Sequence, residues 1–228
     1  MTVHIPWLGS FTEEESNRIF MLLLDDDTED SPWMVMGSLQ FSATAKFHES
    51  LETYARRLQR PWFIAGMLPI LYSWPGIPRK RQLAPDIFVA FAPDRPRASF
   101  DVETEGAFPA FVLEVVSPAS ADRDQTEKRT AYGQLGAREY ALFSPFADRP
   151  SELIGYRRSA AGTFEPWPTD DQGRLWSDVL ELYLVAQGTI IRAATREGAL
   201  LPTLSEAEQV IERLRQENEQ LRRQAKGD

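Results

Sequence analysis

Two acidic residues stand in or beside apolar strands, where an ionised carboxylate is costly. Glu114 lies inside the run 110–116 (AFVLEVV), and Asp86 opens the run 86–91 (DIFVAF). Burying an unpaired charge is strongly unfavourable, so Glu114 requires a metal ion, a positively charged partner or a proton. Two strands that each offer one carboxylate predict a site for a divalent cation.

A predicted helix after Glu114 carries three polar or aromatic residues on one face. Asp124, Lys128 and Tyr132 recur at every fourth position, and such residues are neighbours on a helix surface. If the helix folds back on the strand, Lys128 supplies a fixed positive charge near two carboxylates. The alternative is a surface ion pair between Asp124 and Lys128, with Tyr132 in the core.

Composition excludes several classes of site. The 228 residues are 43% apolar and can bury one sizeable core. No cysteine is present, which excludes disulfides, thiolate metal sites and a cysteine nucleophile. The two histidines, His4 and His48, are far apart in sequence, which argues against zinc. The net charge of −9 argues against a surface that coats nucleic acid generally.

Neither a signal peptide nor a membrane span is expected. The first residues lack a basic start followed by an apolar segment, and no stretch reaches about 18 uninterrupted apolar residues. We therefore expect a soluble protein of the cytoplasm, without a membrane partner.

The elements that position the acids are expected to form a mixed sheet with helices on it, an α/β (α+β) fold. Apolar periodicity, proline and glycine punctuation and helix-capping residues define them. Helices are predicted over 12–24, 44–60 and 121–134, and strands over 33–41, 62–72, 86–91, 110–116, 139–143, 151–158, 163–167 and 180–192.

The chain changes character from about residue 202, where Glu, Gln and Arg become frequent. Apolar residues follow a heptad, and Asn218 takes an a position, where one polar residue commonly fixes a parallel two-stranded register. The apolar positions are Leu204, Ala207, Ile211, Leu214 and Leu221. We predict a domain over 1–201 and a coiled-coil helix over 202–228 that forms a homodimer; a solvated helix, or one packed on its own domain, is the alternative.

The sequence resembles the Uma-two family of endonucleases, which belongs to the restriction-endonuclease-like PD-(D/E)XK superfamily. The resemblance is specific between about 84 and 145, looser over 44–83, and extends to 198–203 (GALLPT). The residues that carry it are Pro85-Asp86, the stretch 114–118 (EVVSP), Asp124, Lys128, Tyr132, Gly136 and Glu139-Tyr140. The fold it implies is a restriction-endonuclease-like, mixed four-stranded core sheet flanked by helices, here with extra β-strands.

The resemblance implies that Asp86, Glu114 and the carbonyl of Val115 bind Mg²⁺, with Mn²⁺ as a substitute, and that the metal acidifies a water that attacks a DNA phosphodiester. The superfamily lysine normally stands at position 116, where this chain has Val116. Lys128 on the following helix is the expected replacement. His48, Asp124, Tyr132 and Ser117 are assigned supporting or substrate-binding roles.

One further departure weakens the enzyme hypothesis. Many relatives carry an early glutamate where this chain reads WMVMG over 33–37. Glu49 or Glu52 on the neighbouring helix is the expected substitute.

Other chemistries lack their motifs. Ser117 has no Gly-x-Ser-x-Gly elbow and no histidine at a recognisable spacing, which disfavours a serine hydrolase. There is no phosphate-binding glycine loop. Three hypotheses remain: a Mg²⁺-dependent DNA endonuclease, an inactive nuclease fold kept for nucleic-acid binding or regulation, and an assembly protein acting through its coiled coil.

Overall fold

A six-stranded mixed sheet forms the centre of the computed structural model, which describes residues 3–5, 9–11, 38–74, 76–116 and 124–227. All neighbouring strands are antiparallel except β8 and β9, which are parallel. In spatial order the strands are β11 (Phe164–Trp167), β10 (Glu152–Arg158), β9 (Glu139–Ser144), β8 (Phe111–Val115), β6 (Ile87–Ala90) and β3 (Phe63–Ala65).

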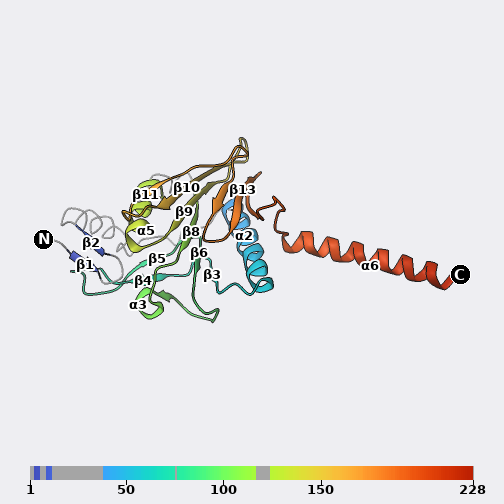
Figure 1. The fold of residues 1–228 in the computed structure, drawn as a ribbon, viewed down its shortest axis with the longest axis horizontal. Helices are drawn as coiled ribbons and strands as arrows, with labels where there is room; N and C mark the ends of the chain where they lie inside the picture. Colours follow the sequence, from blue (N-terminus) through green and yellow to red (C-terminus); the bar gives the residue numbers. More distant parts are fainter. Residues whose placement is uncertain (1–2, 6–8, 12–37, 75, 117–123, 228) are drawn as a thin grey trace.

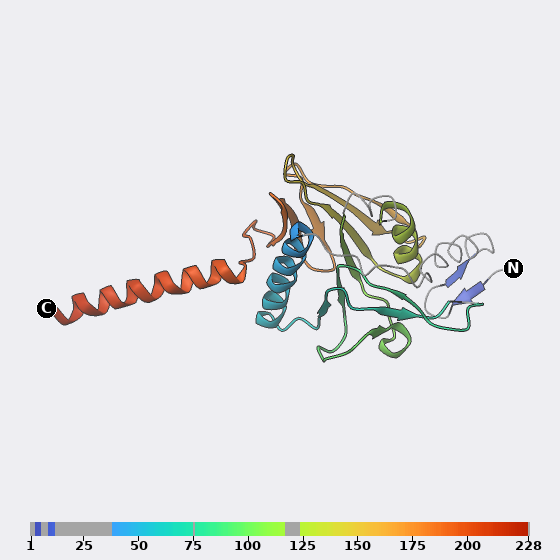
Figure 2. The ribbon, with the colours of Figure 1, turned by 180° about the vertical axis from the view of Figure 1, so that it is seen from behind.

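Each face of this sheet is covered by a helix and a small three-stranded sheet (Figure 1 and, from behind, Figure 2). One face carries α2 (Ser38–Arg57) with β12 (Leu175–Ser177), β13 (Leu182–Gln187) and β14 (Ile190–Ala194). The other carries α5 (Arg129–Leu135) with β4 (Ile70–Tyr72), β5 (Arg81–Leu83) and β7 (Phe100–Asp101), which leads into the short α3 (Val102–Glu105). A π-helical turn, η2 (Asp124–Lys128), runs directly into α5.

The two-residue period of β8 decides which layer each side chain meets. Phe111 and Leu113 belong to the core on the α2 side, whereas Val112 belongs to the core on the α5 side. Because successive side chains of a strand alternate between faces, Glu114 lies on the α5 side. The sheet therefore presents this acid to the helix that follows it in sequence.

The predicted fold class is confirmed. Strands β3, β6, β8 and β9 form the mixed core, and β10 and β11 extend it. The predicted strands 86–91, 110–116 and 139–143 agree with β6, β8 and β9 to within a few residues.

Three boundaries differ from prediction. The expected strand 33–41 is wrong where it is described, because α2 begins at Ser38 and buries Ala43 and Phe47 on one helical face. The expected strand 62–72 is divided into β3 and β4 by Met67, whose φ is +51°, and by the proline after Leu68. The expected strand 180–192 is the hairpin of β13 and β14, turned at Gly188 with φ +58°.

Several short elements were not expected, namely β5, β7, α3 and β12, together with the hairpin of β1 (Val3–Ile5) and β2 (Gly9–Phe11). The predicted helix 12–24 lies outside the described residues. Within the described part of the chain, no helix has the length and apolar composition to cross a membrane.

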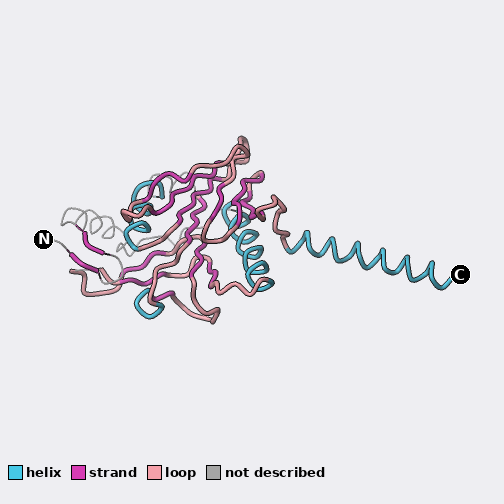
Figure 3. Tube along the Cα trace, viewed as in Figure 1, coloured by secondary structure: helices cyan, strands magenta, loops and turns pink. Residues whose placement is uncertain are grey.

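The last helix, α6 (Leu204–Gly227), extends away from the body (Figure 1; cyan in Figure 3). A capping box fixes its start: Glu206 accepts a hydrogen bond from the amide of Thr203 at 2.9 Å, and its own amide donates to Oγ1 of Thr203 at 3.4 Å. Arg192 of β14 donates to the same Glu206 carboxylate at 2.7 Å. The helix is thus clamped to the body by its first turn.

Candidate active site

Antiparallel pairing of β6 and β8 brings the two predicted acids together. Ile87 faces Leu113 in the ladder, so Asp86, one residue earlier, lies opposite Glu114 and Val115. Asp86 Oδ2 accepts a hydrogen bond from the amide of Val115 at 2.7 Å, and the amide of Asp86 donates to Glu114 Oε2 at 3.4 Å. Only 2% of Glu114 is exposed. The acids are therefore tied to each other's backbone at one edge of the core.

Lys128 supplies the positive charge that Glu114 requires. Its Nζ lies 3.1 Å from Glu114 Oε1 and 2.8 Å from Asp124 Oδ1, and all three side chains are largely buried. Val116 is packed in the core on the α5 side. The structure thus brings Lys128 to the acids from the following helical segment.

Tyrosine hydroxyls brace this arrangement. Tyr132 donates to Glu114 Oε1 at 2.8 Å, and its ring packs against that of Tyr140 with centroids 5.2 Å apart. Tyr140 in turn donates to the carbonyl of Asp124 at 2.9 Å, which fixes η2 against β9. A π-helical turn is uncommon and recurs at functional sites; here it holds Asp124 and Lys128 against the strand end. We call Asp86, Glu114, Asp124 and Lys128 the ion cluster.

Burial shifts the proton equilibria of the ion cluster. Removal from water raises the pKa of Glu114 to about 8, although the Lys128 ammonium opposes this shift. Burial also raises the pKa of Asp86, while the hydrogen bond from Val115 opposes the rise. For Lys128, burial alone would lower the pKa, but the charges of Glu114 and Asp124 hold it above its ordinary value. Lys128 therefore stays charged, and burial favours the protonated form of Glu114 near neutral pH even beside this ammonium.

The donor set of the ion cluster suits a hard divalent cation. Asp86 and Glu114 offer carboxylate oxygens, and the Val115 carbonyl lies at the same strand end. Ionised, the three acids carry two negative charges in excess of the single ammonium, which a divalent ion would balance. Among the described residues no group of three or more acidic or histidine side chains is arranged around a metal position. Two carboxylates and a carbonyl at one strand end are oxygen donors of the kind that Mg²⁺ prefers.

Sequence reasoning missed Gln40. Its amide Nε2 donates to the Val115 carbonyl at 2.8 Å, and its side chain also contacts Asp86. The sequence predicts a strand over 33–41 at this position, but Gln40 lies on the first turn of α2, which points at the end of β8.

The other predicted residues lie elsewhere. His48 faces a neighbouring cavity, with Nδ1 3.8 Å from Glu52, so Glu52 is directed to His48 and not to the cluster. Glu49 accepts a hydrogen bond from the amide of Leu204 at 3.4 Å, at the start of α6. The structure places neither Glu49 nor Glu52 in contact with the ion cluster, so their expected role as substitute for the early acid stays a prediction. Ser117 lies outside the described residues.

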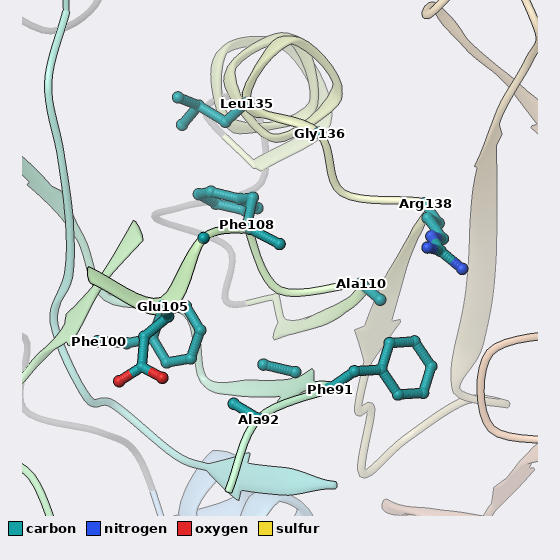
Figure 4. A pocket seen from close by; sticks show the side chains of 12 residues that line it. Phe91, Ala92, Phe100, Glu105, Phe108, Ala110, Leu135, Gly136 and Arg138 are labelled. Atoms are coloured by element: carbon teal, nitrogen blue, oxygen red, sulfur yellow. The ribbon is translucent and has the colours of Figure 1, made fainter. Parts of the chain in front are cut away.

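A second cavity of about 160 Å³ lies at the opposite end of β6 and β8 (Figure 4). Phe91, Phe108 and Leu135 give it an apolar lining, and Arg138 lies over the Phe91 ring at 5.6 Å. Its acid, Glu105, is already paired with Arg95 at 2.8 Å. This cavity therefore lacks the paired buried acids that distinguish the ion cluster.

Comparison with known proteins gives one family. Residues 32–187 match the model of the Uma2 family, described as "putative restriction endonuclease". No curated protein matches the chain significantly. Among solved structures, the crystal structure of "a putative nuclease belonging to DUF820" from Anabaena variabilis is similar at 12% identity, covering 63% of this chain and 74% of that one, with a TM-score of 0.46.

Proposed function

The chain belongs to the Uma2 family of restriction-endonuclease-like proteins, and we propose that it is a Mg²⁺-dependent endonuclease that hydrolyses DNA phosphodiester bonds. The observation that carries the proposal is the ion cluster, in which Asp86 and Glu114 meet at one strand end beside the ammonium of Lys128. Two acids and a lysine are the groups that metal-assisted phosphodiester hydrolysis uses.

Each residue of the ion cluster has a defined task in this proposal. Asp86, Glu114 and the Val115 carbonyl would hold Mg²⁺, for which Mn²⁺ can substitute. When bound, the metal acidifies a water and offsets charge that develops on the phosphate. Lys128 remains protonated and offers its ammonium to a phosphate oxygen or to the attacking water. Asp124 orients Lys128 through the 2.8 Å ion pair.

Tyr132 and Gln40 position these groups without touching the reacting atoms. Tyr132 fixes Glu114 Oε1 through its 2.8 Å hydrogen bond, so the carboxylate has one orientation. Gln40 restrains the Val115 carbonyl at 2.8 Å. Placing the acids and the lysine before the substrate arrives lowers the cost of organising them during the reaction.

Metal removal tests the proposal. We expect the purified protein to nick supercoiled plasmid DNA with Mg²⁺ or Mn²⁺ and to leave it intact with excess chelator, because hydrolysis depends on the metal. Single-stranded DNA and RNA of equal length are tested in parallel to define the substrate. An absence of cleavage on every substrate, with Mg²⁺ binding measured by calorimetry, would refute the nuclease proposal.

A second function is favoured by one observation. Lys128 forms ion pairs with both Glu114 and Asp124, and buried ion pairs of this kind also fit a fold that has lost its chemistry but kept its stability. In that case the protein is a nucleic-acid-binding or regulatory module. Binding of DNA that is unchanged by chelator, together with an absence of cleavage, identifies this outcome.

We also propose that α6 pairs with a second copy of the chain as a parallel coiled coil. Ile211 and Leu214 are about half exposed although they lie on one stripe of the heptad, so packing of α6 onto its own domain is not what the structure has. In a parallel pair Glu217 at a g position faces Arg222 at the next e position of the second copy. Asn218 adds a preference for the two-stranded register.

The substitution Leu214→Glu is expected to weaken self-association at least about 100-fold, because it buries an unpaired charge in the seam. Sedimentation equilibrium measures this change. Gln216→Glu adds the same charge on the outer face of α6 and is expected to leave the dimer intact. A wild-type protein that stays monomeric at every concentration contradicts the dimer proposal.

A further inference from the structure

A cavity of about 300 Å³ opens beside the ion cluster, between the first turns of α2 and the loop that joins β3 to β4. Two large apolar side chains are exposed at it: Phe41 is 61% exposed and Met67 is 56% exposed. Thr44, His48 and Gly66 complete most of the lining. Exposed aromatic and thioether groups gathered at one hollow are typical of a binding surface.

The lining of this cavity touches the backbone that carries the proposed metal ligands, although no lining residue belongs to the ion cluster. The amide of Met67 donates to the carbonyl of Pro85 at 3.0 Å, one residue before Asp86. A Cβ atom on Gly66 would stand 3.0 Å from the Asp86 carbonyl, so a side chain at this position would press on the backbone of the proposed metal ligand. Gln40, which contacts Val115, directly precedes the lining residue Phe41 on α2. The cavity therefore lies near the backbone of two proposed metal ligands, Asp86 and Val115.

The backbone conformation of Met67 is a second observation in favour of a binding role for this cavity. Its φ of +51° is left-handed, a region that costs a residue with a side chain appreciable backbone energy. Burial of the Met67 side chain does not offset this cost, because more than half of it is exposed. Backbone strain that exposes an apolar side chain beside polar, reactive groups is typical of functional loops.

From this geometry we infer that the cavity binds one unpaired nucleobase of the substrate, stacked on Phe41 and covered by Met67, next to the scissile phosphate. The inference rests on the proposed nuclease function and narrows its substrate. Every base has an apolar face that stacks on aromatic rings, and its edge can meet the imidazole of His48. A base inside a duplex already has both faces stacked and must leave the helix to enter such a site. The favoured substrate is therefore a single strand, or a duplex with an unpaired nucleotide.

Binding without cleavage tests the inference separately from catalysis. In excess chelator, fluorescence anisotropy measures the affinity of the full-length protein for a labelled single strand, for its duplex, and for the duplex with one unpaired nucleotide. The same strands carrying 2-aminopurine report stacking directly, because the fluorescence of this base analogue changes when its stacking partner changes.

The variant Phe41→Ala is expected to weaken binding of the single strand and of the unpaired-nucleotide duplex by about 5- to 100-fold, with a much smaller effect on the perfect duplex. Phe91→Ala is the matched control, since Phe91 is 51% exposed at the opposite end of β6, and no effect on binding is expected. Met67→Gly removes the covering side chain while permitting the left-handed backbone, so it is expected to weaken the same two ligands and to keep the fold.

The outcomes separate the two proposals. Selective loss of single-strand binding and of the 2-aminopurine signal in Phe41→Ala and Met67→Gly supports the nucleobase site, whether or not cleavage occurs. Equal effects on single strand and duplex, or no difference from Phe91→Ala, overturn it. If either of these overturning results is found while metal-dependent cleavage is intact, the nucleobase site is refuted and the nuclease proposal stands.

Discussion

Replacing Lys128 with alanine is expected to lower the free energy of unfolding by about 3–5 kcal/mol and to abolish cleavage. The ammonium lies 3.1 Å from Glu114 and 2.8 Å from Asp124, so its removal leaves buried acids without their cation. Cleavage is lost because the proposed mechanism has no second cation of the chain to meet the phosphate. Chemical denaturation measures the stability, and plasmid nicking measures the activity.

The matched control is Lys80→Ala. Lys80 also meets two carboxylates, Asp101 at 2.5 Å and Glu103 at 2.9 Å, but these pairs lie at the surface. An exposed ion pair contributes about 1 kcal/mol or less, so this variant is expected to be nearly as stable as the parent and fully active. Equal destabilisation by the two variants would show that burial of the Lys128 pair is energetically unimportant. Cleavage by Lys128→Ala would remove this residue from the chemistry.

Glu114→Gln is expected to reduce cleavage by at least about 10²–10³-fold and to stabilise the metal-free protein at alkaline pH. The amide is a poor metal ligand but keeps the shape of the side chain, so the activity falls without a cavity. The stability gain has a defined pH range, because the pKa of Glu114 is raised from 4.5 to about 8 in the folded protein. The folded chain holds a proton that the unfolded chain releases.

The sign of this pH effect follows from linkage. A raised folded pKa contributes stability that is fully present below about pH 4.5 and is lost as the pH rises through about 8. Glutamine stays neutral at every pH, so the variant does not lose this part of the free energy of unfolding. The stability of the variant relative to the parent therefore increases from about pH 5 to about pH 9. Urea denaturation in chelator across this range measures the difference. A difference that is independent of pH would mean that Glu114 is ionised throughout.

Glu139→Gln is the control for activity. Glu139 is buried on the neighbouring strand β9 and its pKa is also raised by burial, but its carboxylate binds Ser177 and Arg157, away from the ion cluster. We expect this variant to cleave DNA at the parental rate. Loss of cleavage in both acid variants would mean that damage to the sheet, and not loss of a metal ligand, explains the result for Glu114→Gln.

The strands that carry the site could be predicted because their signals are local. Apolar runs bounded by proline and serine identified β6 and β8, and one acid inside such a run drew attention to Glu114. The spacing of Asp124, Lys128 and Tyr132 predicted a shared helical face. Their convergence on Glu114 depended only on a short return of the chain, which strand-turn-helix units usually make.

Gln40 could not be predicted, because its role depends on a distant contact. It lies 75 residues from Val115 in sequence, and no local pattern relates the two. The same holds for the hydrogen bond between Ser177 and Glu139, which joins β12 to β9. The sequence predicts a continuous strand through Met67, because the left-handed conformation falls on Met67 itself and not on the neighbouring Gly66, where it would be expected. Tertiary packing, and not propensity, determines all three.

The hydrogen bonds that clamp the start of α6 have a consequence for the distance between the two cleavage positions of a dimer. Arg192 and the capping box hold Glu206 from two sides, so α6 leaves the body as a stiff arm and not as a tether. If two copies pair along this arm, the separation of their ion clusters is set by protein geometry. Such an assembly would cleave at two positions separated by a constant distance along the nucleic acid. A substitution of Glu206 that removes the clamp would make this distance variable without changing the rate of either cleavage.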